Sequence, residues 1–153
     1  MQQKHKAQIS VGVKEDRKDK NPTEKSKTGA LGETLAAKFL EGKGYKVLKH
    51  NYRKPWGEID IICEKGGAVR FVEVKTVSRE IDLKNVSREN MDYRPEELVD
   101  ARKLKKLSRT AALYMEVSRD TREYQIDVVG IILDKNAKVA RCRLFEQALE
   151  DNL

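Results

Sequence analysis

Two carboxylates and a lysine interrupt the apolar runs of residues 57–75, GEIDIICEKGGAVRFVEVK. Asp60 lies in the first run, and Glu73 and Lys75 lie in the second. An unpaired carboxylate is costly to bury or shifts its pKa, so each of these acids needs a partner or a function. A Glu73–Lys75 ion pair, or an edge strand with one solvated face, would be a purely structural explanation.

The Gly66-Gly67 pair predicts a tight hairpin between these two runs. Side chains alternate along a strand, so Glu58 and Asp60 are expected on one face and Ile59 and Ile61 on the other. Counting outward from the turn places Asp60 opposite Glu73, with Cβ atoms ~5 Å apart. Two like charges at this spacing destabilise the pair unless a cation compensates them, and a divalent ion would do so.

Glu33 is a candidate for a third carboxylate. It lies in a helix expected from Thr28 or Gly29 to about Lys43, whose apolar face is formed at a 3.6-residue period by Leu31, Leu35, Ala36, Phe39 and Leu40. Glu33 falls at the edge of this stripe, where a glutamate turned toward the core needs a partner. We therefore expect Glu33 on the same sheet face as Asp60 and Glu73.

These residue types together match the needs of phosphodiester hydrolysis. Mg²⁺ takes oxygen ligands, including one or two carboxylates, and a bound metal activates water and polarises a phosphoryl oxygen. Lys75, next along the same strand face, could hold the water and stabilise developing charge.

The elements that must position these residues follow the order αβββαββ, an α/β mixed sheet flanked by helices. Strands are expected over residues 44–53, 57–65, 68–78, 123–133 and 137–146. The second helix starts at Pro95 or is capped by Asp100, and its apolar face carries Leu104, Leu107, Ala111, Tyr114 and Met115. Residues 79–94 are expected to form a flexible loop. Residues 1–28 are interpreted as a disordered polar tail, and residues 29–153 as the folded domain.

Composition limits the class of protein. The 153 residues carry a formal net charge of +7, but residues 1–28 alone hold eight Lys/Arg against four Asp/Glu. The charge therefore suggests a polyanion partner only weakly. No apolar run approaches the ~18 residues of a membrane span, and residues 1–20 lack a secretory signal. Cys63 and Cys142 show no metal or disulfide spacing, which favours a reduced, cytoplasmic setting.

Basic residues cluster where they could contact phosphates. The helix face with Arg102, Lys105, Lys106 and Arg109 is equally consistent with phosphate binding and with a solvated surface. Arg53 and Lys54 precede the second strand. Trp56 beside them could stack on a base, although packing within the loop is the expectation.

The combined motifs resemble the PD-(D/E)XK nuclease superfamily, with Asp60 and the E-V-K of residues 73–75 on consecutive strands. More narrowly, GALGETLAAKFLEGKGYKVLKHNYR, GEIDII, FVEVKT, ARKLKKLSRTAALYM and IDVVG resemble the YraN-like family of predicted endonucleases, itself distantly similar to Holliday junction resolvases. Ile59 stands where the motif often has proline. The likeness covers about residues 29–149.

This resemblance implies an endonuclease that cleaves DNA, with branched or nicked DNA among the candidate substrates and Mg²⁺ or Mn²⁺ as cofactor, and it is compatible with a homodimer. It implies that Glu33, Asp60 and Glu73 are metal ligands, that Lys75 is the catalytic lysine, and that Glu58 is a supporting carboxylate or an alternative ligand. Lys103 and Asp127 also match family positions, either as a buried Lys–Asp pair or in contact with substrate. RNA as substrate stays open, as does a module on the same fold that binds nucleic acid or protein without cleavage.

Overall fold

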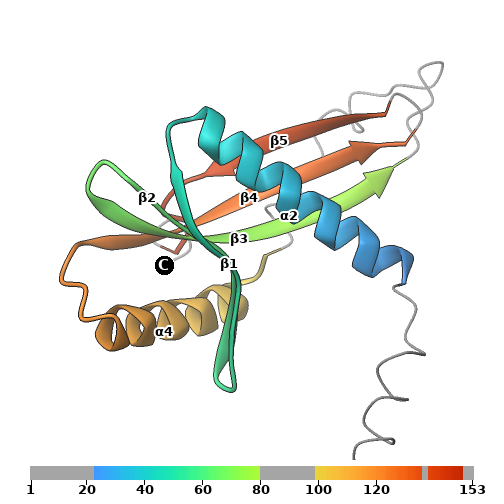
Figure 1. Cartoon of the computed structure of the whole chain (residues 1–153). Coiled ribbons are helices and arrows are strands. Elements are labelled where there is room, and N and C mark those ends of the chain that lie inside the picture. The colour runs from blue at the N-terminus through green and yellow to red at the C-terminus, as the bar shows by residue number, and fades with distance from the viewer. Residues whose placement is uncertain (1–22, 80–98, 136–137, 150–153) are drawn as a thin grey trace, which may run out of the picture.

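The computed structural model describes residues 23–79, 99–135 and 138–149 (Figure 1). The elements, in chain order, are α2 (Glu24–Gly42), β1 (Lys46–Lys54), β2 (Gly57–Lys65), β3 (Ala68–Arg79), α4 (Ala101–Val117), β4 (Tyr124–Asp134) and β5 (Val139–Phe145). This order confirms the predicted αβββαββ fold.

The five strands form one mixed sheet in the order β1-β2-β3-β4-β5. Neighbouring strands are antiparallel except β3 and β4, which are parallel. Parallel strands need a long crossover connection, and α4 lies in the connection between β3 and β4. None of the helices in the described residues is long and apolar enough to cross a lipid bilayer.

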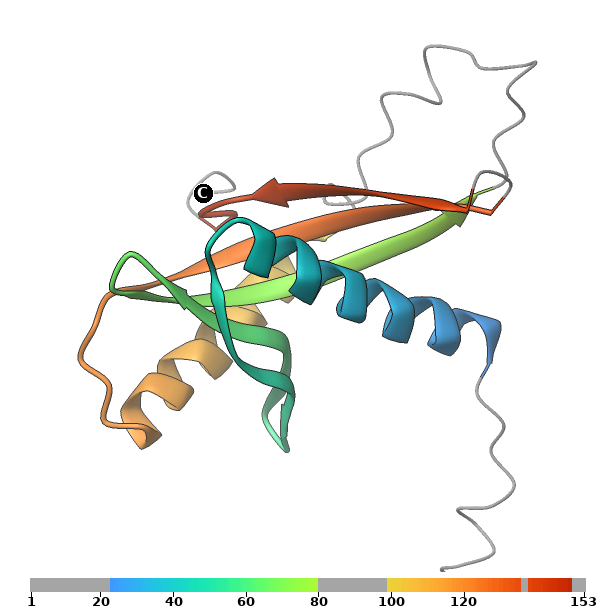
Figure 2. The same cartoon turned by 45° about the horizontal axis from the view of Figure 1, so that its top comes forward.

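The two helices cover opposite faces of the sheet (Figures 1 and 2). Each helix buries its own apolar cluster against the strands. The α2 cluster contains Ala36, Ala37 and Leu40 packed on Ile61, Cys63, Val72, Val129 and Ile131. The α4 cluster contains Leu104, Leu107, Ala111, Tyr114 and Met115 packed on Ile59, Phe71, Ile126 and Val128. The predicted apolar face of α4 is therefore confirmed, whereas Leu31 of α2 is 50% exposed.

Helix α2 begins at Glu24, earlier than the expected Thr28 or Gly29. Thr23 caps it, because its side-chain oxygen accepts a hydrogen bond from the Ser26 amide at 3.1 Å. Apolar periodicity missed this first turn because its side chains are exposed and polar. The boundary placed at residue 28 was therefore wrong for residues 24–28, and residues 1–22 lie outside the described part of the chain.

Helix α4 begins after Asp100, one of the two predicted starts, and the Asp100 carboxylate accepts from the Lys103 amide at 2.7 Å. Strand β3 continues to Arg79, the first residue of the loop predicted over 79–94. The rest of that segment lies outside the described residues.

The β2–β3 hairpin turns at Gly66 and Gly67, which have φ values of +60° and +77°. Both values are accessible to glycine and match a tight primed turn. The register runs from Lys65↔Ala68 to Ile61↔Val72, where the pairing of β2 with β3 ends. Beyond this point β2 pairs only with β1, and β3 pairs only with β4. The two strands therefore separate, and the sheet forks, between Ile61 and Asp60 on β2 and between Val72 and Glu73 on β3.

The fork also explains an incorrect expectation about β2. Ile59 and Ile61 are both buried, but Ile59 packs with the α4 cluster and Ile61 with the α2 cluster. They do not share a face, because the β1–β2 hairpin bends out of the plane of the sheet once it has left β3 (Figure 2).

Gly57 lets β2 approach α4 closely. A side chain at this buried position would overlap the Oγ1 atom of Thr110, which is itself 1% exposed. We expect Gly57→Ala to lower the free energy of unfolding by ~1–3 kcal/mol through overpacking. Urea denaturation measures the loss. In a double-mutant cycle, Thr110→Ala should recover part of it, since that change removes the overlapping atom.

Gly29→Ala is the matched control for Gly57→Ala. Gly29 lies in α2, and a side chain there would meet no atom within 4 Å. Because alanine has the higher helix propensity, this control should leave stability unchanged or raise it by up to ~1 kcal/mol. An equal loss from both changes would mean that crowding against Thr110 is unimportant.

Candidate active site

Asp60 and Glu73 meet at the fork between β2 and β3. They continue the register that ends at Ile61↔Val72, so they stand opposite each other as the spacing predicted. The backbone amide of Val74, which lies beyond the paired part of β2 and β3, donates a hydrogen bond to Asp60 Oδ2 at 2.8 Å. The carboxyl groups of Asp60 and Glu73 are also hydrogen-bonded to each other. Glu73 is only 5% exposed.

Burial makes both carboxyl groups reluctant to ionise, and at Glu73 the Asp60 charge adds to this effect. The pKa of Glu73 rises to about 7, first because the side chain is buried and second because of the Asp60 charge. The pKa of Asp60 is also raised, mainly by burial, although the Val74 amide opposes the shift. Two adjoining carboxylates that resist carrying full charge together form a site that favours an added cation.

Lys103 provides the cation that contacts Glu73. Its Nζ atom forms an ion pair with Glu73 Oε1, and its side chain is 57% exposed. The expected structural alternative, a Glu73–Lys75 ion pair, is therefore replaced by a pair between a strand and a helix. The physical reason is that α4 packs over the face of β3 that carries Phe71 and Glu73, which brings the first turn of α4 above Glu73. Lys75 lies two residues further along β3 and shares this face by alternation.

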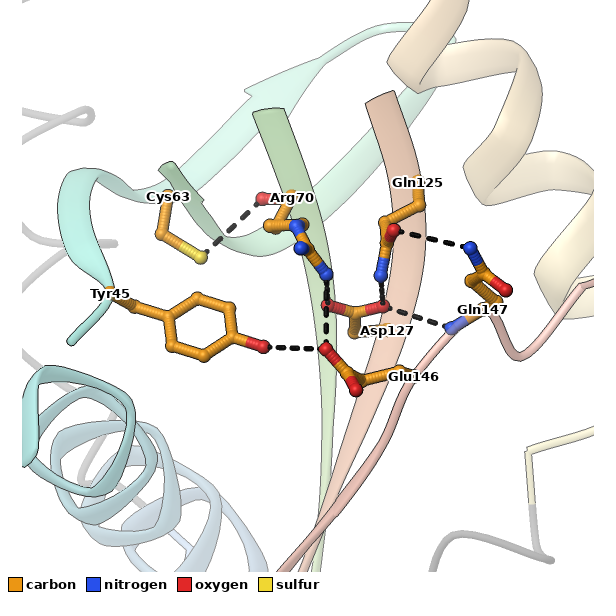
Figure 3. A network of polar contacts seen from close by, with 7 residues as sticks. All are labelled: Tyr45, Cys63, Arg70, Gln125, Asp127, Glu146 and Gln147. Carbon is orange, nitrogen blue, oxygen red and sulfur yellow. Dashed lines mark hydrogen bonds and ion pairs between the residues drawn. The ribbon is translucent and has the colours of Figure 1, made fainter. Parts of the chain in front are cut away.

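The proposed Lys103–Asp127 pair is not formed. Asp127 lies on β4 and is fully buried, and its ion pair is with Arg70 of β3 (Figure 3). Arg70 stands opposite Gln125, two residues before Asp127 on the same face of β4. This parallel register brings Arg70 to Asp127, while Lys103 is held at Glu73.

Glu33 approaches Asp60 from α2, on the face opposite α4, so the expectation that all three acids share one sheet face was wrong. Burial and the Asp60 charge raise the pKa of Glu33, while a hydrogen bond from Asn51 and the charge of Arg53 oppose the shift. Glu33 thus lies close enough to Asp60 for their charges to interact, and its hydrogen bond with Asn51 connects it to β1. Asn51 was missed by the sequence analysis. Its φ of +49° is one that asparagine tolerates, but nothing in the sequence links it to Glu33.

The residues at this site fit a hard cation, with two adjoining carboxylates instead of the three that were expected. Within the described ranges, no three His, Cys, Asp or Glu side chains are grouped closely enough to hold a metal ion. Asp60 and Glu73 are nevertheless adjoining and mutually repelling, and Mg²⁺ commonly uses one or two carboxylates with water completing its shell. Asp60 and Glu73 would hold such an ion, and direct ligation by Glu33 stays a prediction.

An open pocket of about 300 Å³ gives access to Glu73. Its lining consists of Lys54, Pro55, Gly57, Glu58, Glu73, Lys103, Lys106 and Leu107. Glu58 is exposed, and its charge contributes to the raised pKa of Asp60. Glu58 therefore lies near the acidic pair, and its role as a supporting carboxylate or an alternative ligand stays a prediction.

A larger groove of about 640 Å³ adjoins this pocket. Its lining consists of Trp56, Arg102, Lys105, Lys106, Arg109 and Leu113, and Lys106 is common to both. The predicted basic residues of α4 thus line the larger groove, and Lys106 also lines the pocket of Glu73. Arg53 lies on β1 opposite Glu58. Trp56 lines this groove and is 47% exposed, and its stacking on a base stays a prediction.

The raised pKa of Glu73 predicts a pH dependence of stability. Below its ordinary pKa of 4.5 Glu73 is protonated in both the folded and the unfolded state, and above about 7 it is ionised in both. Between these limits the folded state binds the proton more tightly, so this group's contribution to stability falls as pH rises. Without metal, Glu73→Gln should remove this decline and be more stable than wild type above pH 7.

Urea unfolding of both proteins across this pH range measures the difference. Glu116→Gln is the matched control, because Glu116 lies exposed on α4, and it should follow wild type. A Glu73→Gln curve parallel to wild type throughout would contradict the raised pKa.

Comparison with known proteins places this site in a family. The model of the family described as "Uncharacterised protein family UPF0102" matches residues 32–131, which include Glu33, Asp60, Glu73, Lys75 and Lys103. A protein of Dictyoglomus thermophilum named "UPF0102 protein" is 35% identical over 113 residues, 72% of this chain and 86% of the relative. Proteins of the same name from Syntrophomonas wolfei and Moorella thermoacetica are 39% and 38% identical over 107 and 122 residues. These matches cover 69% and 78% of this chain and 84% and 92% of the relatives. The chain belongs to the UPF0102 family.

Proposed function

We propose that this protein is a metal-dependent endonuclease that hydrolyses phosphodiester bonds of DNA, with Mg²⁺ or Mn²⁺ as cofactor. The observation that carries the proposal is the pair of buried Glu73 and partly buried Asp60, which lies at the fork of the sheet and whose carboxyl groups have raised pKa values. Both free cysteines fit a reducing cytoplasm. A homodimer is part of the proposal for branched substrates, which present two strands for cleavage.

Each residue near the pair has a proposed role. When bound, the divalent ion would supply an activated water and polarise the scissile phosphate. Asp60 and Glu73 would hold it, and Glu33 would add negative charge from the α2 side. Lys75 would orient the attacking water along the strand face that carries Glu73 and stabilise developing negative charge. Lys103 would balance the Glu73 charge and contact a phosphate at the mouth of the pocket.

The basic groove supports a nucleic-acid substrate. Arg102, Lys105, Lys106 and Arg109 form one face of α4 beside the acidic pocket. A row of cations can hold successive phosphates without reading sequence, and such binding weakens as salt rises. The acidic pair lies at one end of this row, where a bound backbone would meet it.

The direct test is strand cleavage. A synthetic four-way junction, a nicked duplex and a linear duplex are incubated with the protein in Mg²⁺, in Mn²⁺ or in a chelator, and the products are separated on a denaturing gel. Metal-dependent scission of at least one substrate is expected. Failure to cut any of them, together with no Mn²⁺ binding by calorimetry, would overturn the proposal.

A second candidate function, a module that binds nucleic acid or protein without cutting, is favoured by the Lys103–Glu73 ion pair. In it a lysine already supplies the cation that the acids need. This candidate predicts DNA binding of equal strength with and without metal, and no heat of Mn²⁺ binding. RNA duplexes and junctions run beside the DNA substrates decide between the two nucleic acids.

A further inference from the structure

Trp56 is placed where an aromatic side chain would not be expected on stability grounds. It is the single tryptophan of the chain. The indole is 47% exposed, in the two-residue turn Pro55–Trp56 that joins β1 to β2. Tryptophan is highly buried on average, so half of a large apolar ring facing solvent gives up stabilisation that burial would provide.

The turn that carries Trp56 is held in place. Pro55 restricts its own φ angle, and Gly57 lies so close to Thr110 of α4 that no side chain would fit between them. The backbone on both sides of Trp56 is therefore restricted, and the indole lines the groove beside α4. Preorganised aromatic groups bind with a smaller entropic cost than mobile ones.

The composition of the groove matches a particular ligand. Trp56 and Leu113 supply apolar surface, and the cations of α4 at positions 102, 105, 106 and 109 recur at helical spacing along the same wall. A flat aromatic ring beside a row of cations is the arrangement that binds single-stranded nucleic acid, with bases stacked on the ring and phosphates on the cations. In an intact duplex the base faces are already stacked on one another and are not available to the indole.

The groove borders the pocket that contains Glu73, because Lys106 lines both. Trp56, in the turn before β2, precedes Asp60 by four residues, a distance of at most about 13 Å at ~3.3 Å per residue. A strand whose base rests on Trp56 would therefore reach the acids within a few nucleotides.

We infer that the groove formed by Trp56 and the basic face of α4 binds an unpaired segment of nucleic acid, with one base stacked on the indole. For its catalytic consequence the inference rests on the proposed function: the substrate then carries a single-stranded flap, overhang or open branch next to the cleaved bond. The binding itself requires neither metal nor cleavage.

Because Trp56 is the only tryptophan, its fluorescence reports directly on this contact. With chelator present, a short single-stranded DNA oligonucleotide should quench the emission, and the corresponding blunt duplex should quench it much less. A single-stranded RNA of the same sequence forms a parallel arm. Quenching by either single strand supports the inference, and the oligonucleotide that quenches more strongly shows whether DNA or RNA is preferred.

Variants test the contact through the anisotropy of a labelled oligonucleotide. Trp56→Ala should weaken single-strand binding by ~10-fold, the scale of one stacked base, and should change duplex binding less than about twofold. Trp56→Phe keeps an aromatic face and should retain most of the affinity. Phe145→Ala is the matched control, because Phe145 is 39% exposed on the opposite edge strand β5, and it should have no effect.

The outcomes separate this inference from the proposed function. Unchanged fluorescence with single strands, or equal losses of single-strand and duplex affinity in Trp56→Ala, would overturn the inference even if DNA is cut. Quenching and a selective affinity loss without metal-dependent cleavage would support the inference while refuting the nuclease.

Discussion

Asp60→Asn and Glu73→Gln are each expected to reduce the rate of Mg²⁺-dependent strand cleavage by ~10³-fold or more. Each change replaces an anionic ligand by a neutral amide of the same shape. Metal catalysis supplies several kcal/mol of transition-state stabilisation, and losing about 4 kcal/mol corresponds to ~10³ in rate. Single-turnover cleavage of the preferred substrate, at saturating protein, measures the effect on the chemical step.

Both variants should remain folded, which separates the loss of activity from a loss of structure. Glu73 is buried and Asp60 is partly buried, and the pKa values of both carboxyl groups are raised, so a neutral amide at either position removes a charge that is costly to bury. At position 60 the new side chain keeps an oxygen that can accept from the Val74 amide. Circular dichroism and urea denaturation should therefore match or exceed wild type above pH 7.

Glu58→Gln is the control within the same pocket. Glu58 is exposed and acts on Asp60 only through its charge, so its removal should change the rate by less than about tenfold. Calorimetry should show weakened Mn²⁺ binding for the Asp60 and Glu73 variants but not for Glu58→Gln. Wild-type cleavage and Mn²⁺ binding in either of those two variants would rule out the assigned ligands.

The part of the site that the sequence could predict is the part determined by local structure. The Gly66-Gly67 turn and strict alternation locate β2 and β3 to within a residue. Once the turn is known, antiparallel counting places Asp60 opposite Glu73, since hairpin register depends only on turn type and length. No tertiary information was needed for that pair.

The partners of those acids depend on tertiary packing and were not predictable in the same way. Lys75 is near Glu73 in sequence, yet Lys103 pairs with it because α4 crosses over β3. Glu33 was expected on the same sheet face as Asp60 and Glu73, because a helical wheel shows which residues face the sheet but not which face of the sheet the helix covers. Helix α2 was also expected to begin too late, because a solvated first turn leaves no apolar signal.

Asp127 shows the same limit from the opposite direction. The family resemblance matched Asp127 and Lys103 to known positions and left open a buried Lys–Asp pair or contact with substrate. The true partner, Arg70, depends on the parallel register of β3 with β4, which is set across the whole α4 crossover. Composition alone could not identify it.

The fork of the sheet unites these observations. Where β2 leaves β3, the backbone amide of Val74 donates a hydrogen bond to Asp60, and Glu73 lines the pocket beside α4. Further along the hairpin, where β2 and β3 are still paired, Arg70 and Asp127 bind the sheet to the residues that follow β5. The site thus lies where β2 and β3 separate, and the buried Arg70–Asp127 ion pair lies at the other end of these strands, near the hairpin turn.

Removal of Arg70 is expected to produce the largest loss of stability. Asp127 is fully buried, and its Oδ1 accepts from Gln125 Nε2 at 2.8 Å and from the Gln147 amide at 3.0 Å (Figure 3). Its Oδ2 lies 3.6 Å from Arg70 Nη1, which also binds Glu146 Oε1 at 3.1 Å. Arg70→Met would leave the Asp127 charge without its cation, at a cost of ~3–5 kcal/mol.

The expected loss has a characteristic pH dependence. Burial raises the pKa of Asp127 even with Arg70 nearby, and Arg70→Met should raise it further. The variant should therefore be least stable relative to wild type at neutral pH, and the gap should narrow as acid protonates Asp127. Urea denaturation at neutral and acidic pH measures the stability loss at neutral pH and its decrease in acid. Adding Asp127→Asn to Arg70→Met should recover stability at neutral pH, because no buried charge remains.

Arg122→Met supplies the matched control. Arg122 also pairs with two acids, at 2.8 Å to Asp120 and 2.9 Å to Glu64, but its side chain is 40% exposed. Exposed pairs contribute little to stability because solvent screens them, so this variant should differ little from wild type. Equal and small losses in both arginine variants would show that Asp127 does not depend on Arg70, and that the hydrogen bonds from Gln125 and Gln147 alone hold the end of the sheet.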